Sequence, residues 1–231
     1  MKIYLTTLIL FFSFAATSFS SVAQAALSFQ QVYPKDYASG LSWVKAQQAL
    51  LKKKLGKNAA RLVSVVFPEV ARYSIWRDYA ETNALERLYV TYGATYADFS
   101  IGYCQMKPSW VEQLEQLIQQ YQLSSFQQLI VFSSTTPSLI RKERIERLSN
   151  LQWQLAYLAA FYEVAKIMYK LPQPSVGFLA ALYNRGFAEK KTIEYWQSVK
   201  AFPWGSQSRK LQFSYAAVAT AFYQEEAKNL F

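Results

Sequence analysis

The chain lacks histidine altogether and contains a single cysteine, Cys104. Without histidine, neither the Ser-His-Asp nor the Cys-His arrangement of nucleophilic catalysis can be built, and a common zinc ligand is missing. A single cysteine cannot form an intramolecular disulfide, so we expect Cys104 to be a buried structural thiol. Any chemistry must therefore use carboxylates, hydroxyls, amides, lysine or arginine, and neither a metal nor a cofactor is expected.

Glycine and proline are also scarce, with seven of each among 231 residues, whereas 52% of the residues are apolar. Few turn-forming residues and long periodic apolar segments predict an all-α fold with a core that needs no disulfides. We expect a single domain over residues 26–231. Its helices are expected near residues 37–55, 58–74, 78–92, 108–122, 137–169, 175–185, 192–199 and 206–229.

Local signals refine this helical prediction at a few places. Asn58 is placed to cap the second expected helix, and Pro108 to occupy the first turn of the fourth. Strand signals are weak. Residues 129–133 form a short apolar run, and residues 95–105 could hold a small β-hairpin or an irregular loop.

The first 25 residues have the pattern of a secretory signal peptide. Met1-Lys2 is followed by an apolar run over residues 3–14 and by small residues that end in Ala23-Gln24-Ala25. Cleavage after Ala25 would send the chain to the periplasm or cell envelope, and an uncleaved N-terminal anchor is the alternative. The formal charge of +10 favours a polyanionic partner such as cell wall, lipid headgroups or nucleic acid, unless it only keeps the surface soluble.

The first segment that could carry chemistry is the apolar run of residues 62–67, which is followed by Pro68 and Glu69. A carboxylate that follows such an apolar helical segment is expected to be partly desolvated. Desolvation raises its pKa, which suits a general acid at neutral pH. The alternative is an ordinary glutamate paired with Arg72, one helical turn further on.

Two later segments could bind a polar ligand. Around the turn at Gly102, Gln105 could offer its amide to sugar hydroxyl or acetamido groups while Tyr103 covers the apolar face of a pyranose. The alternative is a helix-start turn with Gln105 satisfied by backbone. Near Gly186, which is expected to end a helix, Asn184 could be a ligand amide and Tyr183 could donate a hydrogen bond toward the carboxylate.

Taken in order, these segments resemble the signature of the lytic transglycosylase and goose-type lysozyme-like superfamily. In that family a helix carries the catalytic Glu with a Ser close behind, a Gly-aromatic/apolar-Met-Gln-apolar-x-Pro motif follows, and an Ala-Tyr-Asn-x-Gly motif comes later. Here Glu69 matches the acid, residues 102–108 the second motif and residues 182–186 the third. The chain departs from the pattern at Val70, at Cys104, and in its longer, aromatic-rich interval before Gln105.

The resemblance implies a lysozyme-like helical domain in which one carboxylic acid does the chemistry. Glu69 would protonate the glycosidic oxygen between MurNAc and GlcNAc of peptidoglycan. It would then act as a base while the muramoyl 6-hydroxyl attacks the anomeric carbon, which gives a 1,6-anhydro end. The substrate-binding residues that the resemblance implies are Ser74, Tyr103, Gln105, Met106, Tyr183 and Asn184.

Two other functions stay open on the same residues. A lysozyme-type hydrolase commonly needs a second carboxylate, for which Asp98, close to the Gln105 motif, is preferred over Asp78, Glu81 and Glu86. A wall-binding module would keep the fold and lack the reaction. In each case we expect a monomer that meets peptidoglycan glycan strands, with room for protein partners in the cell envelope and with no nucleic acid.

Overall fold

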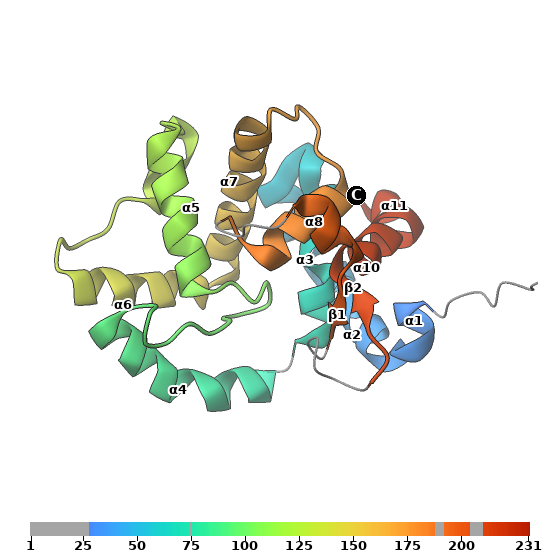
Figure 1. The fold of residues 1–231 in the computed structure, drawn as a ribbon, viewed down its shortest axis with the longest axis horizontal. Helices are drawn as coiled ribbons and strands as arrows, with labels where there is room; N and C mark the ends of the chain where they lie inside the picture. Colours follow the sequence, from blue (N-terminus) through green and yellow to red (C-terminus); the bar gives the residue numbers. More distant parts are fainter. Residues whose placement is uncertain (1–27, 74, 188–191, 204–209) are drawn as a thin grey trace, which may run out of the picture.

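The computed structural model describes residues 28–73, 75–187, 192–203 and 210–231, without the side chains of residues 75–82. Most of these residues are helical, as the composition predicted, and Figure 1 shows how the helices are arranged. The helices are α1 (Phe29–Val32), α2 (Pro34–Leu55), α3 (Ala59–Arg72), α4 (Ile75–Tyr92), α5 (Pro108–Gln120), α6 (Pro137–Leu148), α7 (Leu151–Tyr169), α8 (Val176–Arg185), α9 (Ile193–Ser198), α10 (Tyr215–Phe222) and α11 (Lys228–Leu230). Short 3-10 helices at Gly56–Asn58 and Ser124–Leu129 and a π-helical turn at Tyr223–Ala227 complete the helical structure of the described residues.

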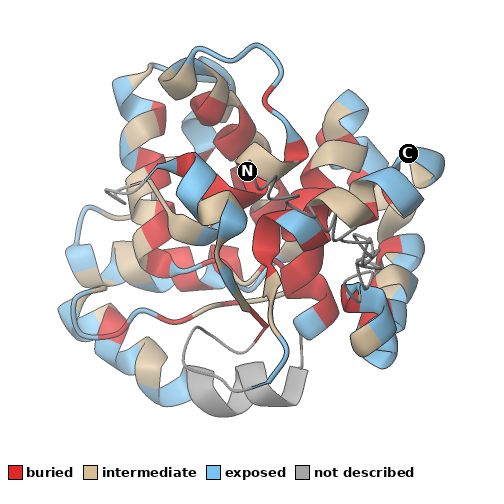
Figure 2. Ribbon diagram, turned by 45° about the vertical axis from the view of Figure 1, so that its right-hand side comes forward, coloured by how far each residue is buried: buried red, intermediate tan, exposed pale blue. Residues whose placement is uncertain are grey.

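Helix α3 lies at the centre of one group of helices. Its residues 62–71 are all buried, because the apolar run covers every side of this helix. It packs against α2, α8 and α10, and Figure 2 shows buried residues gathered on the inner faces of the helices. The approach of α2 is close at Gly40, where an added Cβ would lie 2.8 Å from the Ala71 Cα. This packing holds Glu69, two residues before Ala71, at the edge of the core.

A second group, α4 to α7, lies on the left of Figure 1 and is joined by a buried charged cluster. Arg144 on α6 donates from Nη2 to Glu115 Oε2 on α5 over 2.7 Å, and from Nη1 to the Tyr89 hydroxyl on α4 over 2.7 Å. The Tyr157 hydroxyl on α7 donates to Glu115 Oε1 over 2.9 Å. Side chains from four helices therefore make hydrogen bonds to one another around the Arg144–Glu115 pair. The sequence analysis did not predict this cluster.

Two expected helix boundaries and one expected helix cap are wrong. Segment 137–169 forms two helices, because the Asn150 side chain caps α7 by accepting a hydrogen bond from the Gln152 N–H over 2.9 Å. The last expected helix begins only at Tyr215, and residues 206–209 lie outside the description. Asn58 stands before α3, but its side chain makes no capping hydrogen bond. Pro108 does begin α5, as predicted.

β-structure is limited to a few of the described residues. Strands β1 (Lys200–Phe202) and β2 (Phe213–Ser214) pair antiparallel late in the chain, where no strand was predicted. In the expected hairpin region, one bridge joins Ile101 to Met106. The apolar run 129–133 is not a strand, since Leu129 ends a 3-10 helix. Within the described ranges no helix combines the length and the hydropathy needed to cross a bilayer.

Candidate active site

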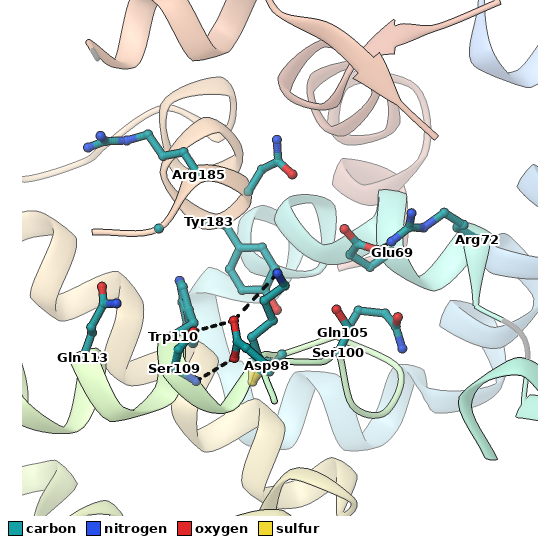
Figure 3. Close-up of a pocket in the computed structure, with 14 residues that line it drawn as sticks. Glu69, Arg72, Asp98, Ser100, Gln105, Ser109, Trp110, Gln113, Tyr183 and Arg185 are labelled. Carbon is teal, nitrogen blue, oxygen red and sulfur yellow. Dashed lines mark hydrogen bonds and ion pairs between the residues drawn. The ribbon is translucent and has the colours of Figure 1, made fainter. Parts of the chain in front are cut away.

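A cavity of about 400 Å³ lies between α3, α5, α8 and the loop that precedes α5, and Figure 3 shows its lining side chains. This volume falls within the range of small-molecule sites, about 300–1,000 Å³. The sequence-predicted residues that line it are Glu69, Asp98, Gln105, Met106, Tyr183 and Asn184. Three segments that are far apart in the chain thus meet at one cavity.

Glu69 is the buried acid of this cavity. Its side chain is 12% exposed, and its Oε2 accepts a hydrogen bond from Arg72 Nη2 over 2.8 Å, which confirms the predicted pairing. Burial raises the pKa of Glu69 above its usual 4.5, while the charges of Arg72 and Lys107 oppose the rise. Because the net direction is upward, desolvation outweighs the two cations. Such a carboxyl group keeps its proton to higher pH than an exposed one and is suited to donate it.

Weakly acidic groups from other elements surround Glu69. Burial raises the pKa of Cys104, Tyr183 and Tyr215, and the Glu69 charge contributes to each rise. The pKa of the Cys104 thiol reaches about 12, and the thiol is buried and free, as predicted. The Tyr215 hydroxyl on α10 is buried and has no hydrogen-bond partner among the described residues. These groups are neutral at neutral pH, so the charges that act on Glu69 come from cations.

The turn that presents Gln105 depends on a glycine and a buried glutamine. Gly102 has a φ of +67°, and an added Cβ would lie 1.8 Å from Gln154 Nε2 of α7. Gln154 donates to the Ile101 carbonyl over 3.2 Å and accepts from the Cys104 N–H over 3.0 Å. Gln105 lines the cavity, and its side-chain amide also donates to the Gly102 carbonyl over 2.9 Å. The expected backbone partner of Gln105 is therefore present, and the same side chain lies at the cavity, where the predicted contact with a ligand stays a prediction.

Helix α8 brings Tyr183 and Asn184 to the cavity and ends at Gly186, as predicted. The Tyr183 hydroxyl donates to the Cys104 carbonyl over 2.6 Å, so the predicted hydrogen bond toward Glu69 is wrong. The Tyr183 hydroxyl bonds to the Cys104 carbonyl and not to Glu69, because the turn places that carbonyl beside the buried phenol. Asn184 is exposed at the cavity, where its amide can meet a ligand.

Asp98 is held at the N-terminus of α5. Its Oδ1 accepts from the Ser109 N–H over 3.1 Å, and its Oδ2 accepts from the Ser109 hydroxyl over 2.8 Å. Lys107 Nζ lies 3.8 Å from Oδ2. Figure 3 shows Asp98 and Ser109 on one side of the view and the Glu69–Arg72 pair on the other. Asp98 is thus a second carboxylate in the same cavity, held in place by these contacts.

Some predicted residues are not found at the cavity. The Tyr103 ring packs against Trp43 and Tyr73, with centroids 4.8 Å and 4.4 Å away, because these rings offer it a large apolar surface. It does not line the cavity, which corrects its expected contact with sugar. Ser74 lies outside the described residues, as do the side chains of Asp78 and Glu81. Glu86 is described and does not line the cavity.

Other lining residues were missed by the sequence reasoning, namely Ser100, Lys107, Ser109, Trp110, Gln113 and Arg185. Lys107 and Arg185 stand inside the recognised motifs, and the helical spacing of Trp110 and Gln113 after Pro108 places them on one face of α5. That spacing is a signal that could have found them. Gln154 and Tyr215 have no such signal, because only the packing of α7 and α10 brings them close.

Comparison of the chain with protein-family models, with curated proteins and with solved structures finds no significant match. The residues of the cavity are therefore the basis on which a function can be assigned. They provide one buried acid, a second and better-solvated carboxylate, three side-chain amides and three cations. This set can bind a polar, hydroxyl-rich ligand and transfer a proton to it.

Proposed function

We propose that this protein is a peptidoglycan lytic transglycosylase with a lysozyme-like fold. It cleaves the β-1,4 bond between MurNAc and GlcNAc and leaves 1,6-anhydro ends. The observation that carries the proposal is the meeting of the buried Glu69 carboxyl with Gln105, Tyr183 and Asn184 at one cavity. These are the residues that the resemblance assigns to the acid and to the substrate. A chance match of short motifs gives no reason for them to meet in space.

Glu69 acts twice in the proposed reaction. Its protonated carboxyl gives a proton to the glycosidic oxygen as the bond from that oxygen to the anomeric carbon of MurNAc breaks. The resulting carboxylate then accepts the proton of the muramoyl 6-hydroxyl while that oxygen bonds to the anomeric carbon. The ring closes, no water is consumed, and Glu69 is protonated again. The amides of Gln105 and Asn184 hold hydroxyl or acetamido groups of the sugars.

The proposal places the protein in the periplasm or cell envelope, where its substrate lies. Residues 1–25 would direct export. The wall carries many carboxylates and other anionic groups, so the excess of basic residues, which gives the full chain a formal charge of +10 with Lys2 included, would concentrate the enzyme near its substrate. The strength of this attraction should fall as the ionic strength rises.

Asp98 supports a second candidate, a lysozyme-type hydrolase. It is the other carboxylate that lines the cavity, and its hydrogen bonds to Ser109 fix its position. A second carboxylate can orient a water molecule or stabilise positive charge at the anomeric carbon. The two candidates differ in the end that they leave on the product.

Mass analysis of fragments released from purified sacculi tests both candidates. Product ends lighter by one water than reducing ends support the transglycosylase, and reducing ends support the hydrolase. Glu69→Gln should lower release by about 10²–10⁴-fold, the usual contribution of a positioned acid or base. The matched control is Glu163→Gln on α7, where the carboxylate pairs with Lys166 at the surface.

If Glu69→Gln releases fragments as fast as wild type and Glu163→Gln, Glu69 is not the acid and the proposal fails. If wild type sediments with sacculi and releases nothing over long incubation, the protein is a wall-binding module of the same fold.

A further inference from the structure

Arg72 links the proposed acid to the segment that follows β1. Its Nη2 donates to Glu69 Oε2 over 2.8 Å, and its Nη1 donates to the Pro203 carbonyl over 3.2 Å. The guanidinium also lies over the Phe202 ring, 5.9 Å from its centroid. The Arg72 side chain is 38% exposed against 12% for Glu69, and both line the cavity. Arg72 is thus the member of the pair that a ligand reaches more easily.

This ion pair conflicts with the proposed reaction. A general acid needs its proton when the bond breaks, whereas a guanidinium bonded to a carboxylate stabilises the deprotonated form. The other ionisable groups that act on Glu69, or on which it acts, come from the loop before α5 and from α8 and α10, and they are Lys107, Cys104, Tyr183 and Tyr215. Only Arg72 forms an ion pair with Glu69 among the described residues, so a change of partner would remove the largest effect that opposes protonation of the acid.

We propose that Arg72 binds a carboxylate of the substrate, so that the cavity selects glycans that carry this group. This inference rests on the proposed function and names the substrate feature that Arg72 recognises. A guanidinium presents paired N–H donors whose spacing matches a carboxylate. Three cations, Arg72, Lys107 and Arg185, line the cavity against two carboxylates, Glu69 and Asp98, so its formal charge of +1 attracts an anion.

Binding then exchanges one carboxylate for another at Arg72. The substrate carboxylate accepts the Nη2 hydrogen bond that Glu69 gives up, and the released Glu69 carboxylate takes a proton from water. Glu69 can now give that proton to the glycosidic oxygen. A neutral glycan leaves Arg72 on Glu69, so it binds more weakly and meets an acid whose protonation Arg72 still opposes. Throughout the exchange the Pro203 carbonyl and the Phe202 ring keep the guanidinium at the cavity.

Binding in an inactive background tests the carboxylate preference of Arg72 without relying on catalysis. Glu69→Gln provides the background, and Arg72→Gln or Arg72→Lys is added to it. Lys53→Gln, at an exposed position in the last turn of α2, is the control for loss of a remote cation. Calorimetry is carried out with three ligands: glycan strands with their peptide stems, strands stripped of peptide so that the lactyl carboxylate is bare, and a neutral chitin oligosaccharide.

Arg72→Gln should weaken binding of carboxylate-bearing strands by about tenfold or more, the effect of losing a charge-assisted hydrogen bond. Binding of the neutral oligosaccharide should stay unchanged within error. Arg72→Lys should recover part of the loss, because an ammonium group keeps the charge without the paired donors. Weakening on stem-bearing strands alone assigns the carboxylate to the peptide, because the lactyl carboxyl is tied up in an amide there. Weakening on stripped strands alone assigns it to the lactyl group of the sugar, and weakening on both strand types means that Arg72 accepts a carboxylate from either source.

Several results would overturn the inference. They are equal weakening on all three ligands, no weakening on any, or the same pattern from Lys53→Gln. Thermal unfolding of each variant separates lost binding from lost structure. The two proposals also fail separately, because lytic function is judged from the products of wild type on sacculi, whereas the carboxylate preference is measured in variants that cannot cleave.

Discussion

Replacing Glu115 with alanine should destabilise the fold much more than removing an exposed carboxylate. The side chains of Glu115 and Arg144 are 8% and 7% exposed, and Glu115 accepts hydrogen bonds from Arg144 Nε and Nη2 and from the Tyr157 hydroxyl. The substitution leaves a buried guanidinium with the more exposed Glu112 as its remaining ion-pair partner. It also removes the nearer acceptor of a buried phenol. Removing one partner of a buried pair costs about 3–5 kcal/mol.

Urea unfolding followed by circular dichroism measures this loss, with Glu163→Ala as the matched control. Glu163 pairs with Lys166, but their side chains are 35% and 30% exposed, so the control should lose at most about 1 kcal/mol. Each kcal/mol shifts the melting temperature by about 2–4 °C in a chain of this size, so Glu115→Ala should melt roughly 6–20 °C lower. Equal losses for the two variants would refute the argument that burial decides the contribution of the pair.

Glu69→Gln should stabilise the fold at neutral pH, because burial raises the folded-state pKa above its usual 4.5. In the window above that value the folded state binds more protons than the unfolded state, so wild-type stability falls as pH rises. The gain in melting temperature should therefore be larger near about pH 7 than near about pH 4, and a gain that does not change with pH contradicts the argument. Tyr183→Phe should cost about 1 kcal/mol in urea unfolding, since it removes one hydrogen bond to the Cys104 carbonyl; a loss near zero would mean that the bond contributes nothing. Gly102→Ala should lower the melting temperature more than Tyr183→Phe, because its Cβ collides with Gln154 at a positive φ. An unchanged melting temperature would show that the turn relaxes freely.

The parts of the fold that could be predicted are those where one residue type dictates the local backbone. Pro108 begins α5 and Gly186 ends α8, as the sequence indicated. Glu69 could be recognised as a buried acid because the apolar run before it covers the whole circumference of α3. In each of these places the signal lies within a few residues of the feature.

The parts that could not be predicted depend on contacts between distant segments. Tyr103 follows a glycine turn that suits a ligand site, yet Trp43 of α2 and Tyr73 determine where its ring packs. The segment before Tyr215 forms a strand instead of a helix because residues 200–202 pair with it. Gln154 fixes the turn that presents Gln105 from a helix whose own sequence gives no sign of that role.

The contact between Gly40 and Ala71 makes the acidity of Glu69 depend on a residue in a neighbouring helix. A methyl group at position 40 would lie 2.8 Å from the Ala71 backbone, so α2 and α3 would have to separate. Because Glu69 belongs to the same helix as Ala71, a displacement of α3 would move the carboxyl group relative to α8 and the loop before α5 and so change the burial that sets its pKa. A mutational change at position 40 could therefore alter the pH range in which the protein works while most of the fold stays intact.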